Sequence, residues 1–118
     1  MVERQPVVIL GGGGFIGANL ARRYLDLGHP VCAVDQEFPA FRLPALSGAV
    51  LMSRDLRNPA ECASVMRPGA LVFHLAADMG GVGYFHSDAD WGAAMRNGRI
   101  TLNVLENADL CDRLAGPG

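Results

Sequence analysis

The stretch "VVILGGGGFIGANL", residues 7–20, sets four consecutive glycines between a β-branched apolar run and the start of an expected helix. A glycine inside a helix or strand costs about 0.5–1 kcal/mol relative to alanine, so this run indicates either a flexible linker or a turn that only bare backbone can make. The residues before it, 6–10, are typical of a strand buried on both faces. After it, apolar residues recur at helical spacing, at Ile16, Leu20, Tyr24 and Leu27. The flanks therefore predict a strand, a glycine turn and a helix rather than a linker.

The rest of the chain repeats this alternation. Further strands are expected at residues 30–34, ending on Asp35, at 49–52 and at 70–77, and further helices at 58–67 and from about 91 to 114. Such alternation over so short a span favours a doubly wound α/β fold, Rossmann-like, with a parallel sheet in the strand order 3-2-1-4 and flanking helices. The prediction is a single domain over residues 1–118 whose ligand lies at the carboxyl ends of the strands, between strands 1 and 4.

The composition is that of an ordinary globular chain. Hydrophobic residues make up 50% of the 118 residues and the formal net charge is −2. The chain therefore lacks the excess of positive charge that binding to nucleic acid or to an anionic membrane surface requires. No apolar run approaches the roughly 20 residues of a membrane span, and the first residues lack a signal-peptide pattern, so we expect a cytoplasmic protein without membrane contact. Cys32, Cys62 and Cys111 lack metal-ligand spacing and are interpreted as reduced packing residues. All 10 basic residues are arginine.

The glycines match two phosphate-binding patterns at once. Gly11, Gly14 and Gly17 fit G-x-x-G-x-x-G, while Gly12, Gly14 and Gly17 fit G-x-G-x-x-G. In either register, the helix N-terminus offers free N–H groups and the positive end of its dipole to a pyrophosphate, provided that no Cβ blocks the approach. Asp35, at the end of the next strand, offers a carboxylate to both ribose hydroxyls and would repel a 2′-phosphate. This arrangement predicts a dinucleotide site that selects NAD over NADP.

Other polar residues carry weaker signals. Asp55 follows the third expected strand, where folds of this kind contact the adenine edge, although a loop aspartate that caps the next helix is an alternative. His74 lies within an expected strand, which favours a buried core histidine over a catalyst. A loop holds His86, Asp88 and Asp90 without a third nitrogen or sulfur ligand, so we interpret them as solvated residues and predict no metal site.

Two short signatures resemble a known family. "GGGGFIG" (11–17) and "HLAA" (74–77) are similar to the glycine and fourth-strand signatures of the extended short-chain dehydrogenases/reductases, the group of NAD-dependent sugar-nucleotide epimerases and dehydratases. "FHLAADMGGVGYFHSD" (73–88), followed by "NGRITLNVLENA" (97–108), resembles the narrower group of GDP-mannose 3,5-epimerases. The resemblance extends over residues 7–115. It departs at His74, where that group has asparagine, and at Gly17, where alanine is also found.

The resemblance implies a role for each residue at a matching position. The residues implied to hold the NAD pyrophosphate are Gly11, Gly14, Phe15, Ile16 and Gly17. Asp35 would bind the adenosine ribose, and Asp55 and Leu56 the adenine edge. Ala76 and Ala77 would line the cofactor channel, and Gly80 and Gly81 would approach the hexose of a substrate similar to GDP-mannose.

The resemblance also implies a catalytic Y-x-x-x-K motif, in which the tyrosine is the base. Tyr24 and Tyr84 are the only two tyrosines, the sequence contains no lysine, and it ends where a fifth strand is expected to begin. No catalytic residue is therefore assigned, and we expect the NAD-binding part of an epimerase without its catalytic and substrate portion. A non-catalytic NAD-binding module, a subunit of a split enzyme and a decayed remnant are the alternatives. Because the sheet would end on an open strand edge, we expect self-association or a complementing C-terminal chain.

Overall fold

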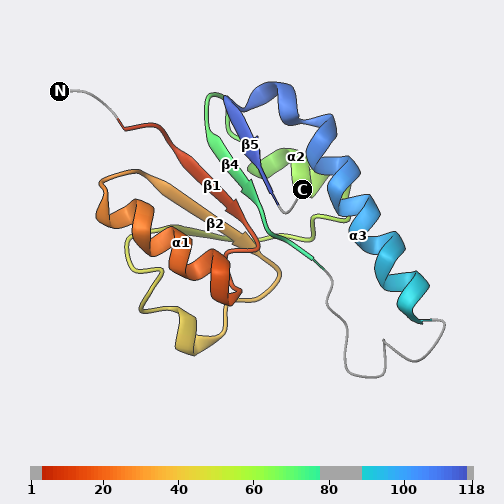
Figure 1. Ribbon diagram of the computed structural model, residues 1–118, viewed down its shortest axis with the longest axis horizontal. Helices are drawn as coiled ribbons and strands as arrows, with labels where there is room; N and C mark the ends of the chain where they lie inside the picture. Colours follow the sequence, from red (N-terminus) through yellow and green to blue (C-terminus); the bar gives the residue numbers. More distant parts are fainter. Residues whose placement is uncertain (1–3, 78–88, 117–118) are drawn as a thin grey trace.

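A single parallel sheet organises the molecule. The computed structural model describes residues 4–77 and 89–116, and for residues 89–94 it describes the backbone alone. The sheet has five strands in the order β3-β2-β1-β4-β5 (Figure 1). The strands are β1 (Val7–Leu10), β2 (Val31–Asp35), β3 (Val50–Ser53), β4 (Leu71–His74) and β5 (Arg113–Ala115). The helices are α1 (Phe15–Asp26), α2 (Pro59–Val65) and α3 (Ala89–Glu106), with 3-10 turns η1 (Ala40–Arg42) and η3 (Ala108–Leu110).

The innermost strand, β1, is buried along its whole length because it is covered on both faces and paired on both edges. Val8, for example, is opposite Cys32 of β2 and Val72 of β4. A β-branched run suits this place, since its side chains pack well on a pleated surface. The strand predicted at residues 6–10 is therefore confirmed as the centre of the sheet.

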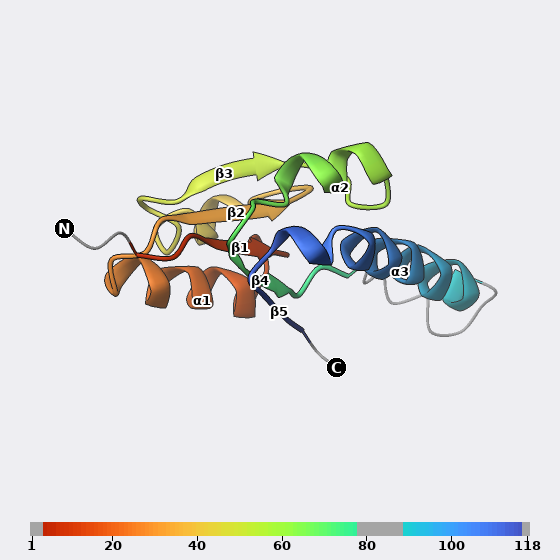
Figure 2. The same cartoon turned by 90° about the horizontal axis from the view of Figure 1, so that it is seen from above.

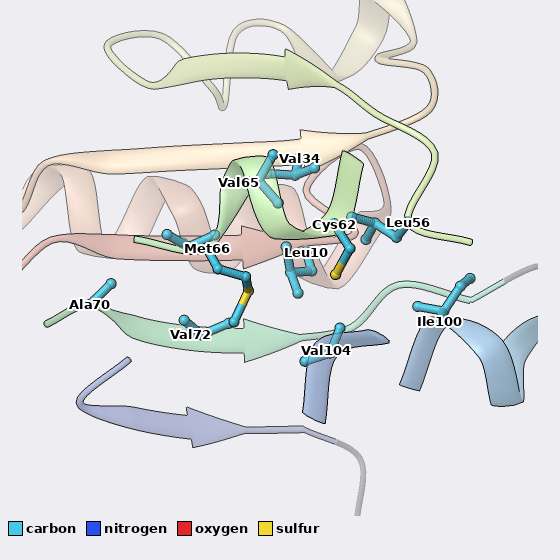
Figure 3. Close-up of a cluster of buried hydrophobic side chains, with 11 residues drawn as sticks. Leu10, Val34, Leu56, Cys62, Val65, Met66, Ala70, Val72, Ile100 and Val104 are labelled. Carbon is cyan, nitrogen blue, oxygen red and sulfur yellow. The ribbon is translucent and has the colours of Figure 1, made fainter. Parts of the chain in front are cut away.

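Helices cover the two faces of the sheet unequally. The α1 helix packs on one face through Ala18 and Ala21, and α2 and α3 pack on the opposite face (Figure 2). The second face carries a cluster of buried side chains from β1, β2 and β4, from the loops beside them and from both helices (Figure 3). Its members include Leu10, Val34, Leu56, Cys62, Val65, Val72, Ile100 and Val104. Among the helices of the described residues, none combines the length and apolar character that a membrane crossing requires.

The expected fold class is confirmed, with two corrections near its C-terminal end. A fifth strand is present, because β5 pairs in parallel with β4, with Arg113 opposite Leu71 and Ala115 opposite Phe73. The helix expected to reach residue 114 instead ends at Glu106, and η3 leads into the new strand. After the helix ends, backbone hydrogen bonds hold this segment beside β4. One of them joins the Asp112 N–H to the Ala70 carbonyl at 2.8 Å. No glycine or proline marks this change between residues 99 and 115, so local sequence pattern favoured a longer helix.

Candidate nucleotide-binding site

A cavity of about 390 Å³ lies at the carboxyl ends of β1, β2, β3 and β4. Its position agrees with the expectation for a doubly wound sheet, in which ligands bind where the strand order reverses. Six of the residues expected to bind cofactor line it, namely Gly11, Gly14, Asp35, Leu56, Ala76 and Ala77. The lining also includes Gly13, Gln36, Glu37, Pro39, Arg54, Arg57, Leu75 and Ile100.

Three of the four consecutive glycines are required by the protein itself. Gly11 has φ +94°, and a Cβ there would lie 2.7 Å from the Leu75 carbonyl carbon. A Cβ on Gly12 would lie 2.6 Å from the Ala33 Cβ, and one on Gly13 would overlap the Glu37 carbonyl oxygen. These contacts leave no room for a side chain, which explains most of the run without any ligand.

Gly14 is different, because the described part of the chain leaves room for a side chain there. Its φ is −82°, which any residue adopts, and a Cβ would meet only the Gly11 carbonyl oxygen at an ordinary 3.5 Å. Gly14 is exposed and lines the cavity. Bare backbone at this position keeps open the space directly in front of α1.

The N-terminus of α1 faces that space without a cap. No described side chain accepts a hydrogen bond from its first turn, and that turn contains no acidic residue. Phe15, Ile16 and Gly17 form this first turn but do not line the cavity, and the Phe15 and Ile16 side chains are each 66% exposed. Gly17 is also needed for packing, since a Cβ there would overlap the Gly11 carbonyl oxygen. An uncapped helix N-terminus beside a glycine turn is suited to an anion.

Asp35 ends β2 and connects the glycine turn to the cavity. Its Oδ2 accepts a hydrogen bond from Gly13 N–H at 2.9 Å, and its Oδ1 accepts one from Gln36 N–H at 2.8 Å. Each carboxylate oxygen can accept two hydrogen bonds and here accepts one, so one acceptor position remains on each. Asp35 thus braces the turn and still presents two acceptors, as a ribose diol requires.

Asp55 does not line the cavity, but its neighbours Leu56 and Arg57 do. The Asp55 carboxylate is held by Arg57 through Nε to Oδ1 and Nη2 to Oδ2, both at 2.8 Å. This hydrogen bonding with Arg57 lowers the pKa of Asp55 below its ordinary value. Asp55 is therefore an ionised anchor for Arg57, and its role toward adenine stays a prediction. Leu56 presents a backbone N–H for which no described residue is the acceptor.

The carboxyl end of β4 forms the remaining wall. Leu75, Ala76 and Ala77 line the cavity there, and Leu75 N–H is bonded to the Leu10 carbonyl at 2.8 Å, which holds this wall against the glycine turn. Gly80 and Gly81, expected to approach a hexose, lie outside the described residues. The same holds for His86 and Asp88.

His74 lies next to this wall but does not line the cavity. Its Nε2 is 3.2 Å from the Thr101 hydroxyl, and its Nδ1 is buried without a partner among the described residues. Burial lowers the pKa of His74, so the imidazole is neutral at pH 7.

Tyr24 packs against Phe73 and His29 on the α1 face of the sheet. Its ring centroid lies 5.5 Å from that of Phe73 and 5.3 Å from that of His29.

The cysteines are free, and burial raises the pKa of the Cys32 and Cys62 thiols. Both contribute to the packing of the core, Cys62 as a buried member and Cys32 as a half-buried neighbour. Among the side chains of residues 4–77 and 95–116, no three of histidine, cysteine or acidic type are grouped so as to hold a metal ion.

Several cavity residues were not predicted from the sequence. Gln36, Glu37 and Pro39 lie within four positions after Asp35, and this closeness to the end of β2 was the only available signal for them. Arg54 and Arg57 come from a loop whose approach to the cavity depends on how β3 pairs. Ile100 is distant in sequence and reads as an ordinary apolar helix residue.

The fold and this cavity define a nucleotide-binding α/β protein. The model of the NAD dependent epimerase/dehydratase family matches residues 7–114, and the chain belongs to that family. NAD is the cofactor after which the family is named.

The chain is similar to proteins of known activity but shorter than they are. It is 35% identical over 106 residues to GDP-mannose 3,5-epimerase 1 of Oryza sativa subsp. indica. The matched residues make up 90% of this chain and 28% of that protein. A crystal structure of UDP-galactose 4-epimerase is 30% identical, with a TM-score of 0.69 over 88% of this chain and 34% of the other. The epimerase Mth375 of Methanothermobacter thermautotrophicus is 26% identical, with a TM-score of 0.80 over 97% of this chain and 35% of the other. This chain therefore spans about a third or less of each of these relatives.

Proposed function

We propose that this chain is the NAD-binding portion of a nucleotide-sugar epimerase similar to GDP-mannose 3,5-epimerase. The observation that carries the proposal is the contrast between Gly14 and its neighbours. Three glycines are bare because protein atoms crowd them, whereas Gly14 is bare with only ordinary van der Waals contact in front of it. A bare residue that the described protein does not require, placed before an uncapped helix N-terminus, fits close approach by a pyrophosphate.

The strand order supports a direction for the dinucleotide across the sheet. The glycine turn follows β1, Asp35 ends β2, and Leu56 and Arg57 follow β3, so phosphate, ribose and base sites come in that order along adjacent strands. Ala76 and Ala77 follow β4 on the other side of the glycine turn, where the nicotinamide half would lie. The residues fit the cofactor in chemistry as well as order, since amide donors, a carboxylate and small side chains occupy the matching places.

Asp35 is proposed as the determinant of NAD over NADP. Its two remaining acceptor positions suit the two hydroxyls of a ribose, and its negative charge opposes a 2′-phosphate. When bound, NAD supplies a transient hydride acceptor for a sugar hydroxyl carbon. This chain's own contribution is to hold and orient that cofactor.

Thermal unfolding with each cofactor tests this proposal. A ligand at one hundred times its Kd that binds only the folded chain stabilises it by about 2.7 kcal/mol. We expect NAD to raise the melting temperature more than NADP does, and Asp35→Ala and Asp35→Asn to reduce the NAD effect and narrow the difference. Equal shifts from both cofactors with the unaltered chain would contradict the assignment.

For the substrate side, we propose that Gly80 and Gly81 approach the hexose and that this chain alone does not epimerise GDP-mannose. Proton removal from a sugar hydroxyl needs a base with a pKa near neutrality, and tyrosine, ordinarily near about 10, needs a neighbouring cation to reach it. The sequence has no lysine to supply one. Arginine is a poor replacement, because its planar fork suits carboxylates and phosphates.

Solvent-deuterium incorporation at C3 or C5 of the sugar, with NAD and GDP-mannose, measures that chemistry. We expect none above the control without protein. Incorporation that disappears in a Gly80→Trp variant would show that the catalytic groups are within this chain.

A second candidate function, a non-catalytic NAD-binding module, is favoured by the absence of lysine and by the position of Tyr24 among core aromatic rings. An adjacent reading frame with a Y-x-x-x-K motif would favour the split enzyme. A gene neighbourhood without such a frame favours the module.

We also propose self-association or pairing with a complementing chain. The expected reason was an open β4 edge, and β5 now covers that edge. A different feature supports the proposal, since Met95, Leu102 and Leu105 on α3 are 62%, 61% and 54% exposed. Light scattering at about tens of micromolar, where apolar contacts of this size become populated, would show association, and a monodisperse monomer would contradict it.

A further inference from the structure

Asn103 is the only buried polar or charged side chain among residues 4–77 and 95–116, with 7% of its surface exposed. It lies on α3, next to the core residue Val104. A buried amide is costly unless its hydrogen bonds are made, so its partners indicate why it is there.

Both partners of Asn103 belong to the loop that borders the cavity. Its Nδ2 donates to the Leu56 carbonyl at 2.9 Å and to the Arg57 carbonyl at 3.0 Å. These bonds join residues 46 and 47 positions apart in the sequence. One side chain therefore uses both of its amide protons to hold two consecutive peptide groups.

The two held residues also border the cavity. Leu56 and Arg57 both line it, and the Leu56 N–H has no acceptor among the described residues. Two hydrogen bonds of 2.8 Å to the Asp55 carboxylate fix the orientation of the planar Arg57 guanidinium. The loop lies outside regular secondary structure, so side-chain bonds such as these determine which groups it presents.

We propose that Asn103 is a positioning residue for the base end of the dinucleotide. By fixing the two peptide groups that follow the α-carbons of Leu56 and Arg57, it holds the loop so that the Leu56 N–H, as a donor to a ring nitrogen, and the Arg57 guanidinium, as a planar surface, receive adenine. This inference rests on the proposed NAD-binding function. It adds a residue on α3 that makes no contact with the cavity itself and acts through the loop.

Calorimetric titration of the folded chain with AMP, with nicotinamide mononucleotide and with NAD tests the inference. Loss of two hydrogen bonds to the loop is expected to raise the Kd for AMP and NAD about tenfold in Asn103→Ala, with the Kd for nicotinamide mononucleotide unchanged. Asn107→Ala is the matched control. Asn107 is the same residue type, its Nδ2 donates to the Asn103 backbone carbonyl at 2.8 Å, and within the described part of the chain it has no hydrogen bond to the loop. It is expected to leave all three affinities within about twofold.

Asn103→Asp serves as a second variant of nearly the same size, in case the alanine variant does not fold. It removes both N–H donors, and the same selective loss of AMP and NAD binding is expected. Equal losses for AMP and nicotinamide mononucleotide, or no loss for either, would overturn the inference and leave the proposed function standing. Failure of the unaltered chain to bind AMP or NAD would overturn the proposed function and the inference together.

Discussion

Two walls of one cavity are built by opposite means. The glycine turn, residues 11–14, presents backbone alone, and its shape follows from the absence of side chains in a crowded place. The arginine loop, residues 54–58, is shaped instead by hydrogen bonds that the side chains of Asp55, Asn58 and Asn103 make. The first wall is specified by residue type within a few positions. The second depends on elements that meet only when the chain has folded.

The largest effect is expected in the glycine turn. Gly11→Ala should lower the free energy of unfolding by about 3 kcal/mol, because it combines a positive φ with overlap against the Leu75 peptide. Gly69→Ala is the matched control, since its φ is +75° and nothing in the described chain lies within 4 Å of the added Cβ. It should cost about 1 kcal/mol from φ alone. Urea unfolding measures both, and equal losses would mean that the overlap relaxes without cost.

Gly14→Ala should separate binding from stability within the same turn. The backbone accepts alanine there, so the free energy of unfolding is expected to change by less than about 0.5 kcal/mol. The Kd for NAD should rise about tenfold or more, because the methyl group occupies the space proposed for pyrophosphate. Gly98→Ala, in open space on α3, is the control and should leave NAD binding unchanged. Unaltered NAD affinity in Gly14→Ala would remove the main support for the proposed function.

In the arginine loop, Asn58→Ala should cost about 1 kcal/mol of stability. The Asn58 side chain caps α2 by accepting from Ala60 N–H at 2.9 Å and Glu61 N–H at 3.2 Å. Asn58→Asp keeps an acceptor and should retain most of the stability. Thermal and urea unfolding are the measurements, and a neutral Asn58→Ala would show that the loop is held by Asp55 and Asn103 alone.

The smallest effect concerns acid stability. Hydrogen bonding to Arg57 lowers the pKa of folded Asp55 below the ordinary 3.8, so this pair stabilises the fold above that pH and the contribution is lost as pH falls through the lowered value. The effect should stay under about 1 kcal/mol, because both side chains are more than a third exposed to water. Either Asp55→Asn or Arg57→Met should remove that part of the acid dependence. Unfolding curves from pH 5 to pH 2 test this, and an unchanged slope in both variants would contradict it.

The sequence predicted the parts of the site that are local in the chain. The strand at residues 7–10, the glycine turn, α1 and Asp35 are all specified within 29 consecutive positions and were found as expected. Phe15 and Ile16 were also expected at the site; they begin α1 but do not line the cavity, so their role toward a cofactor stays a prediction. Arg57 was missed because an arginine in a loop reads as a solvated charge until its position beside the cavity is known.

The end of the chain shows the converse. Residues 113–115 read as the end of a helix, and they form β5 because the open edge of β4 offers unpaired backbone groups to them. The spacing of apolar residues near the end of the chain predicts a helix, but it carries no information about the edge of β4, which is formed by residues 71–73 far earlier in the sequence.

By itself, the amino-acid sequence determined the alternation of strands and helices, the order of the first four strands and the place of the glycine turn, because hydrophobic period and residue type act over a few neighbouring positions. Only the tertiary structure decided which glycine is bare without being crowded, which loop after β3 borders the cavity and which helix residue holds that loop. Those features depend on contacts such as the one from Asn103 to Leu56, across 47 positions. Such contacts arise from packing α3 against the loop after β3, and no local pattern encodes a distance between segments so far apart.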